Sequence, residues 1–207
     1  MFSLLLRGFV LGLAIAASPG PIFFLCVRRT LLQGRLAGLL SGFGVATADA
    51  FYAAIATFGV AALTTAFVAG RRPLAVVGGA ILLGFGLRIL LERGRNAEAA
   101  GDPTGRGLAW AYASTLGLTI TNPATILSFA ALAATLGFGT GGSFTGPALV
   151  VAGVLLGSAA WWCILVLATS LLRARLTPAV VRGIGVFSGA AIAALGILAV
   201  ISAFSGL

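Results

Sequence analysis

The chain has 207 residues, of which 60% are hydrophobic and only 8% charged, whereas a typical soluble domain is about 25% charged. This leaves too little polar surface to cover a water-soluble globule, so the sequence predicts an all-α integral membrane protein. The formal net charge of +9 comes from 13 arginines that lie mostly between apolar segments, without a lysine. Such a distribution indicates membrane topology and argues against a nucleic-acid-binding face.

Six transmembrane spans are predicted, at about 3–27, 36–67, 74–91, 107–136, 147–172 and 183–204. They form a single transmembrane domain over 1–207, with repeat one at about 1–92, a polar linker at about 93–106 and repeat two at about 107–207. A cleaved secretory signal is the less favoured interpretation of the first span, because Arg7 interrupts its apolar core.

The arginines also predict the orientation of the spans. Ten of them fall in the first, third and fifth loops, against three in the N-terminus and the other loops. Because positive charge is retained on the cytoplasmic side, both termini are expected outside. Each half then has an odd number of spans, which makes the two halves inverted relative to one another.

Two short motifs predict that helices break and restart inside the membrane. In each, a residue that often caps helices stands directly before a proline, which fits the first helical turn because its missing N–H needs no partner there. The capping residues are Ser18 in the first span and Asn122 in the fourth. The two motifs comprise Ser18, Pro19, Gly20, Pro21, Thr121, Asn122 and Pro123.

Broken helices at corresponding points of two halves are typical of the binding site of a transporter. Non-helical backbone is tolerated at membrane depth only where it lines a cavity or is buried in protein. Two restarted helices would direct free N–H groups and partial positive charge into that cavity, which suits a carboxylate. All seven motif residues are therefore candidate substrate-binding residues. The alternative is two proline kinks whose freed carbonyls bind neighbouring helices.

Asp49 is the only acidic residue well inside a predicted span, where an ionised carboxylate costs about 2.5 to 3.5 kcal/mol on insertion scales. It is expected to carry a proton or to pair with a substrate ammonium group, and is a candidate for both substrate binding and proton coupling. The alternative is a structural ion pair or hydrogen bond, with Arg88 as one partner. Tyr52, Trp161 and Trp162 could line the same cavity, or could simply pack between helices.

Glycines and arginines mark the start of the second span. Three glycines at four-residue spacing, Gly34, Gly38 and Gly42, share one helix face and suit close packing within the chain or in a homodimer. Three arginines, Arg28, Arg29 and Arg35, are predicted to form a short basic loop that orients the protein, or that contacts substrate or anionic lipid.

Self-comparison finds three matching stretches in the same order in the two halves. The matches are Leu11-Gly12-Leu13 before Pro19 with Leu116-Gly117-Leu118 before Pro123, Gly44-Val45 and Asp49 with Gly153-Val154 and Ser158, and Gly79 and Gly86 with Gly189 and Gly196. Their offsets are 104, 109 and 110 residues. Because the three offsets are nearly equal, they favour an internal repeat.

These motifs together carry a family resemblance. The sequence resembles the LysE/RhtB family of amino-acid exporters in the following stretches: Pro19-Gly20-Pro21, Arg28-Arg29 to Gly34, the glycine ladder leading to Asp49-Ala50-Phe51-Tyr52, Gly84-x-Gly86-Leu87-Arg88, and Asn122-Pro123. The resemblance implies a LysE-type translocator of the bacterial inner membrane, not an enzyme. Such a protein exports amino acids or related metabolites by antiport driven by a proton or ion gradient.

The expected partners are an amino acid or similar zwitterion, protons or another coupling ion, and the lipid bilayer, with no cofactor and no nucleic acid. One alternative is a transporter of a metal ion or other small solute, although a single acidic intramembrane residue and no histidine argue against a divalent-cation site. Another is a membrane thiol-disulfide electron shuttle using Cys26 and Cys163. These cysteines are 137 residues apart, which does not fit the repeat offset.

Overall fold

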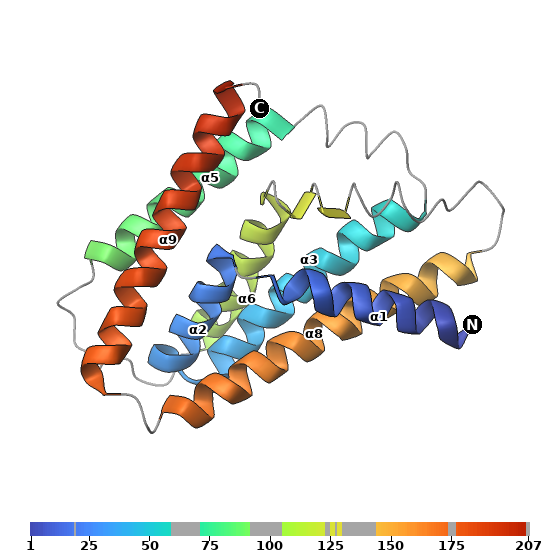
Figure 1. Cartoon of the computed structure of the whole chain (residues 1–207), viewed down its shortest axis with the longest axis horizontal. Helices are drawn as coiled ribbons and strands as arrows, with labels where there is room; N and C mark the ends of the chain where they lie inside the picture. The colour runs from blue at the N-terminus through green and yellow to red at the C-terminus, as the bar shows by residue number, and fades with distance from the viewer. Residues whose placement is uncertain are drawn as a thin grey trace.

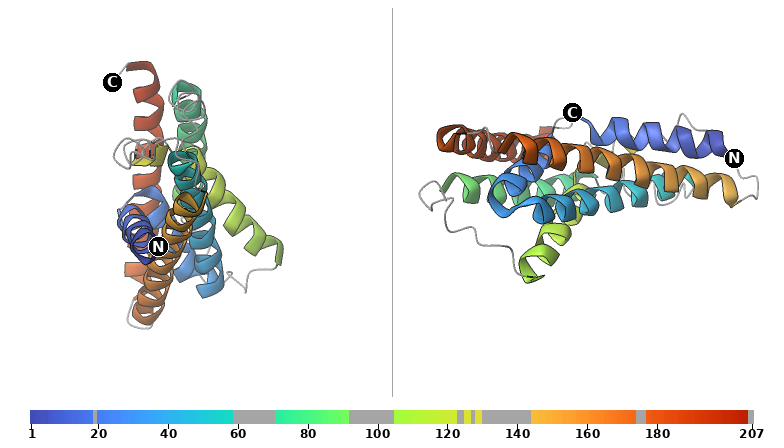
Figure 2. Two further views of the ribbon diagram at one scale, coloured as in Figure 1. Left: turned by 90° about the vertical axis from the view of Figure 1, so that its right-hand side faces the viewer. Right: turned by 90° about the horizontal axis from the view of Figure 1, so that it is seen from below.

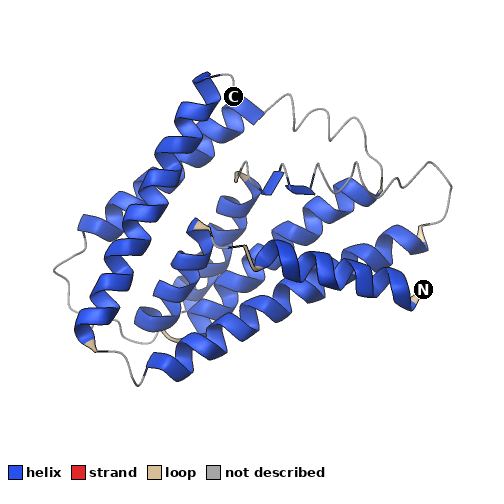
Figure 3. Cartoon of the chain, viewed as in Figure 1, coloured by secondary structure: helices blue, strands red, loops and turns tan. Residues whose placement is uncertain are grey.

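The computed structural model describes residues 1–18, 20–58, 71–91, 105–122, 125–126, 128–129, 144–173 and 177–205. Within these residues the chain is helical and contains no strand (Figures 1 and 3), which confirms the all-α prediction. The helices are α1 (Phe2–Ala16), α2 (Pro21–Gln33), α3 (Arg35–Thr57), α5 (Arg71–Leu91), α6 (Gly105–Ile120), α8 (Thr145–Arg173) and α9 (Pro178–Ser205). Pro19, Pro123, the linker at 93–104 and the end of the second predicted span lie outside the described residues.

The first predicted span consists of two helices, since α1 ends at Ala16 and α2 begins at Pro21. α2 then continues to Gln33, so Arg28 and Arg29 lie inside a helix, and the prediction that they form a loop with Arg35 was wrong. The physical reason is that nothing between Pro21 and Gln33 breaks a helix. The turn to α3 consists of Gly34 alone, whose φ of 91° is a conformation that favours glycine.

The described helices form two groups (Figure 1). In one, α1 packs along α8, while α3 packs against both α8 and α6. In the other, α5 and α9 pack against each other, and α2 joins the two groups because it contacts α3, α8 and α9. Figure 2 shows α6 projecting away from the layer that the other helices form.

Small residues allow α1 and α8 to approach each other closely. Gly8 and Gly12 on α1 face Gly153 and Gly157 on α8, and a Cβ atom at any of the four would overlap backbone atoms of the opposite helix. At Gly157 the overlapped atom is the carbonyl oxygen of Phe9. Two four-residue glycine repeats in register are typical of helix pairs that associate within a membrane.

The glycine ladder of α3 also packs inside the chain. A Cβ atom at Gly38 would meet the Thr30 hydroxyl on α2, and one at Gly42 would meet the Trp162 side chain on α8. Gly34 instead occupies the turn before α3 and has no atom this close. For Gly38 and Gly42 the structure therefore favours packing within the chain, while a homodimer stays a prediction.

Apolar and polar side chains are distributed as expected for a protein in lipid. Many large apolar side chains are exposed along α8: Leu155, Leu156, Ile164, Leu167, Leu171 and Leu172. The interior instead holds polar residues: Arg29, Thr30, Ser41, Asp49, Thr57, Ser114, Thr115, Thr119, Ser158 and Thr169. Among the described helices, α3 with 23 residues and α8 with 29 are long and apolar enough to cross a membrane. An apolar exterior around polar groups that bind one another suits a membrane protein.

Candidate functional site

A cavity of about 430 Å³ lies where the two predicted helix breaks come together, a size within the range of about 300 to 1,000 Å³ that is usual for small-molecule sites. Ser18 and Gly20 from the first break line it, as do Asn122 and Thr125 from the second. Asp49 on α3 lines it as well. The chain thus brings candidate residues from both halves to one cavity.

The first break differs in detail from the prediction. Gly20, not Ser18, is the N-cap residue of α2, with φ −144° and ψ −176°, and Pro21 occupies the first turn. The physical reason is that a residue before proline is driven towards extended backbone, so the second proline of the motif, not the first, starts the helix. Among the described residues, no side chain caps α2. Ser18 is instead exposed in the break and lines the cavity.

The second break follows α6, which ends at Ile120. The Asn122 N–H donates to the carbonyl of Thr119 at 3.2 Å, and the Asn122 carbonyl accepts from the Ile126 N–H at 3.1 Å. A carbonyl that already accepts the first bond of the next helical turn is typical of an N-cap residue. Asn122 therefore has the backbone position that the sequence predicts for it.

Asp49 is 2% exposed and accepts a hydrogen bond of 2.7 Å from the Ser158 hydroxyl, which links α3 to α8. Arg88, the partner considered from the sequence, is exposed on α5. In the part of the chain that the structure describes, the hydrogen-bond donor to Asp49 is thus a neutral group. Because a buried carboxylate without a cation is costly, the cavity beside Asp49 suits a proton or an ammonium group.

Tyr52 and Thr121 do not belong to the set of residues that line this cavity. The Tyr52 hydroxyl donates to the carbonyl of Ile120, and its ring stacks on Phe129 with centroids 5.8 Å apart. The Thr121 hydroxyl donates to the carbonyl of Gly117 at 2.9 Å. Both side chains therefore contact the region around the end of α6, next to the second break.

The model of the LysE type translocator family matches residues 13–203 of this chain. The chain belongs to that family. Over 68 residues this translocator is also 44% identical to the uncharacterized membrane protein YahN of Escherichia coli strain K12. That match covers 33% of the chain and 30% of the E. coli protein. No solved structure matches significantly.

Membership confirms the resemblance found in the sequence. It identifies a membrane protein of a translocator family. The membrane assignment agrees with the apolar exterior.

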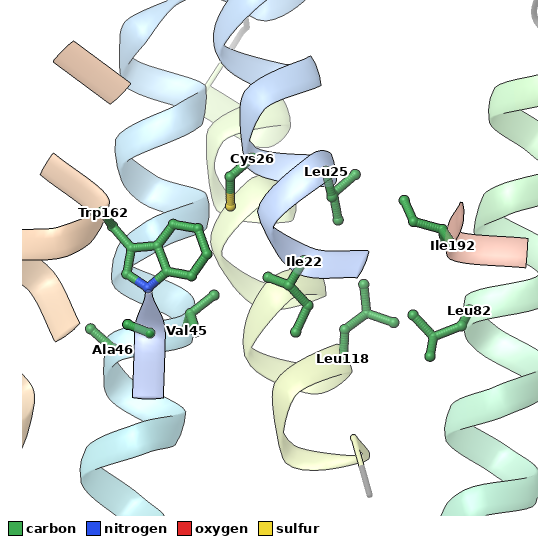
Figure 4. Close-up of a cluster of buried hydrophobic side chains, with 10 residues drawn as sticks. Ile22, Leu25, Cys26, Val45, Ala46, Leu82, Leu118, Trp162 and Ile192 are labelled. Carbon is green, nitrogen blue, oxygen red and sulfur yellow. The ribbon is translucent and has the colours of Figure 1, made fainter. Parts of the chain in front are cut away.

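Trp162 of this translocator lines the cavity and belongs to a cluster of buried hydrophobic side chains. Trp161 packs against that cluster but does not line the cavity. Trp162 is 3% exposed, and its Nε1 is buried without a hydrogen-bond partner among the described residues. In Figure 4 this nitrogen lies at the edge of the ring that faces Val45 and Ala46. The sequence did not distinguish the two tryptophans, although Trp162 is four residues after Ser158 and so shares its helix face.

Arg29 is a buried charge whose position the sequence did not predict. Its Nη1 donates to the Ser41 hydroxyl and to the Ala111 carbonyl, both at 2.9 Å, and its Nη2 donates to the Ser114 hydroxyl at 2.8 Å. These bonds connect α2 to α3 and α6. Arg29 does not belong to the residues that line the cavity.

The two cysteines are free thiols, and Cys26 is buried in the hydrophobic cluster drawn in Figure 4. Cys26 is 0% exposed. A thiol shielded in this way is poorly placed for exchange with a partner disulfide. The site therefore offers binding groups, not thiol chemistry.

Proposed function

We propose that this translocator exports a small zwitterionic solute, an amino acid or a close relative, across the bacterial inner membrane. The observation that carries the proposal is that both helix breaks and the buried Asp49 line one cavity. The start of α2 offers backbone N–H groups and partial positive charge to a carboxylate. Asp49 offers a negative charge to an ammonium group.

A pair of inverted three-span halves would account for the position of Asp49. Asp49 and Ser158 occupy matching places in the two halves, 109 residues apart, and they are hydrogen-bonded to each other. α3 and α8 run in opposite directions. Gly42 comes before Asp49 on α3, whereas its contact Trp162 comes after Ser158 on α8. A contact between a residue and its own counterpart arises at a twofold axis, so this bond supports the inverted repeat.

A second pair of contacts supports the same axis. A Cβ atom at Gly86 would overlap the backbone of Ala193, and one at Gly196 would overlap the backbone of Leu83. Gly86 and Gly196 are counterparts 110 residues apart, and so are Leu83 and Ala193. Such reciprocal contacts are expected at a twofold interface. With the arginine distribution, they favour six spans with both termini outside the cell.

Asp49 couples export to the proton gradient in this proposal. In the inward-facing state the substrate ammonium pairs with the carboxylate. After the substrate leaves on the outside, Asp49 takes up a proton and returns neutral, because a neutral carboxyl group costs less to bury than an unpaired carboxylate. Each turnover then exchanges one substrate for one proton.

The test is efflux from proteoliposomes loaded with a panel of amino acids, with and without a pH gradient. We expect gradient-dependent efflux for at least one of them. Asp49→Asn keeps the side-chain shape but cannot titrate, so it should reduce gradient-driven efflux at least tenfold. Ser170→Ala on α8 is the matched control, because the Ser170 hydroxyl donates to the Val166 carbonyl and does not line the cavity.

Two results would contradict the proposal. Absence of efflux for every amino acid in the panel, from protein that is correctly inserted, would refute the substrate class. Full gradient-driven efflux by Asp49→Asn would refute the role of the carboxylate in coupling.

A further inference from the structure

The cavity has a polar side and an apolar side. The polar side chains come from the helix breaks and from α3 and α6, and include Ser18, Asp49, Thr119 and Asn122. The described lining residues of α5 and α9 are apolar: Leu82, Leu195, Leu198 and Ala199. The α5–α9 pair thus contributes an aliphatic wall, while the polar groups come from the other helices and the breaks. In Figure 4 the Leu82 side chain points from α5 towards Leu118 on α6.

Charge is sparse among the described lining residues, where Asp49 is the one ionisable acid and no arginine appears. One carboxylate pairs with one ammonium group. A second ammonium, on a substrate side chain, would meet leucines and remain unpaired, which is unfavourable. An acidic substrate side chain would likewise meet no cation, because Arg29 donates its hydrogen bonds to Ser41, Ala111 and Ser114 outside the cavity.

Trp162 supplies a donor for which no described residue is an acceptor. An indole N–H can only donate, and a buried donor without a partner is unfavourable. Trp162 lies one helical turn beyond Ser158, the residue that binds Asp49. In an α-amino acid one carbon separates the ammonium from the carboxylate. The carboxylate can therefore lie near Trp162 while the ammonium lies at Asp49. A carboxylate oxygen of the substrate is a suitable acceptor for the Trp162 N–H.

We propose that the substrate is a neutral amino acid with an apolar side chain of about the size of leucine. Its ammonium pairs with Asp49, its carboxylate accepts from the Trp162 indole N–H as well as from the N–H groups at the start of α2, and its side chain contacts Leu82, Leu195 and Leu198. This inference rests on the proposed function and narrows it to one substrate class. Burial of the apolar side chain against the aliphatic wall contributes affinity that a charged side chain cannot obtain there.

The first experiment compares efflux of leucine, lysine and glutamate from proteoliposomes that contain the full chain. The leucine side chain is aliphatic, whereas the side chains of lysine and glutamate each carry a charge. We expect the kcat/KM for leucine to exceed that for lysine and for glutamate at least tenfold. Efflux of lysine or glutamate in preference to leucine would overturn this inference and leave the proposed function standing. No efflux of any amino acid would overturn both.

The second experiment places a carboxylate on the aliphatic wall. Leu198 lines the cavity and is 58% exposed, so the carboxylate of Leu198→Glu can lie in the cavity and the variant should fold. It should move the ratio of lysine to leucine efflux at least tenfold towards lysine. An unchanged ratio would show that the substrate side chain does not contact α9, and would overturn the proposed orientation.

The third experiment tests Trp162 with a matched pair of variants. Trp162→Phe keeps an aromatic ring but removes the N–H, and should raise the KM for leucine about tenfold. Competition by 3-methylbutylamine, which is leucine without its carboxylate, should change less than twofold. Trp161→Phe removes the neighbouring indole N–H, which is also buried without a partner but lies outside the cavity lining, and should leave the KM for leucine unchanged. Equal effects of the two variants would overturn the carboxylate contact.

Discussion

Arg29 binds neutral groups although it carries a full charge inside the helix bundle. Its three hydrogen-bond acceptors are two serine hydroxyls and one backbone carbonyl. Hydrogen bonds to a charged group contribute about 1.5 to 3 kcal/mol each, while removing the guanidinium from water costs several kcal/mol. The two terms nearly cancel, so the net effect of Arg29 on stability should be small.

This balance predicts an unusual order of mutational effects. Arg29→Met should change the free energy of unfolding by less than about 1 kcal/mol, because it removes the charge together with its bonds. The double variant Ser41→Ala, Ser114→Ala should cost about 3 kcal/mol, because it leaves the guanidinium buried with fewer acceptors. Unfolding in detergent, followed by circular dichroism, measures both. Greater damage from Arg29→Met than from the serine pair would contradict this reasoning.

At the scale of helices, the contact between α1 and α8 depends on glycine. Gly12→Ala would place a Cβ atom on the backbone of Val154, which cannot move as a side chain can. We expect a loss of about 1 to 3 kcal/mol, the range usual for overpacking. Gly117→Ala on α6 is the control, because a Cβ atom there meets no atom within 4 Å. The control should be neutral or stabilising, since alanine favours helix over glycine by about 1 kcal/mol.

Thermal denaturation of the two purified alanine variants distinguishes them. A lower midpoint for Gly12→Ala alone is the expected result. Equal midpoints for the two variants would mean that the α1–α8 contact adapts to the added methyl group.

Helix breaks were predictable because proline chemistry is local, whereas the partners of buried charges were not. The motif at 18–21 predicted a break, but the choice between Ser18 and Gly20 as cap depends on which of two prolines starts the helix. Arg29 resembles a loop residue until Ser41 and Ser114 on other helices are known to accept its bonds. Which tryptophan lines the cavity likewise depends on how α8 is rotated against its neighbours, a tertiary property.

The whole molecule should have both ends of the chain outside the cell. Single cysteines introduced near residue 1 and residue 205 into a variant without native cysteines should react with a membrane-impermeant maleimide in intact cells. A cysteine at position 98, in the predicted cytoplasmic linker, should react only after lysis. Labelling of only one terminus in intact cells would contradict the inverted six-span arrangement, because that arrangement puts both on one side.

The proposed axis through Asp49 and Ser158 predicts that the two residues can exchange places. Asp49→Ser alone should abolish gradient-driven efflux, and Ser158→Asp alone should place two carboxylates in contact and reduce stability. The double variant restores one carboxylate and one hydroxyl at the same point, and should recover efflux to within about tenfold of the original protein, or about 1.4 kcal/mol in barrier height. A double variant as inactive as Asp49→Ser would contradict an exchangeable pair.

The bond between Asp49 and Ser158 also bears on how such a protein could arise from a shorter one. Two identical three-span chains that pair across a twofold axis place the same residue on both sides of it. A homodimer can therefore have two carboxylates at that point or none, but never one. A single carboxylate with a neutral donor requires two halves that differ, and fusion of duplicated halves into one chain allows each half to change separately. A single carboxylate at the proposed axis is thus a property that the fused chain can have and a homodimer of identical halves cannot.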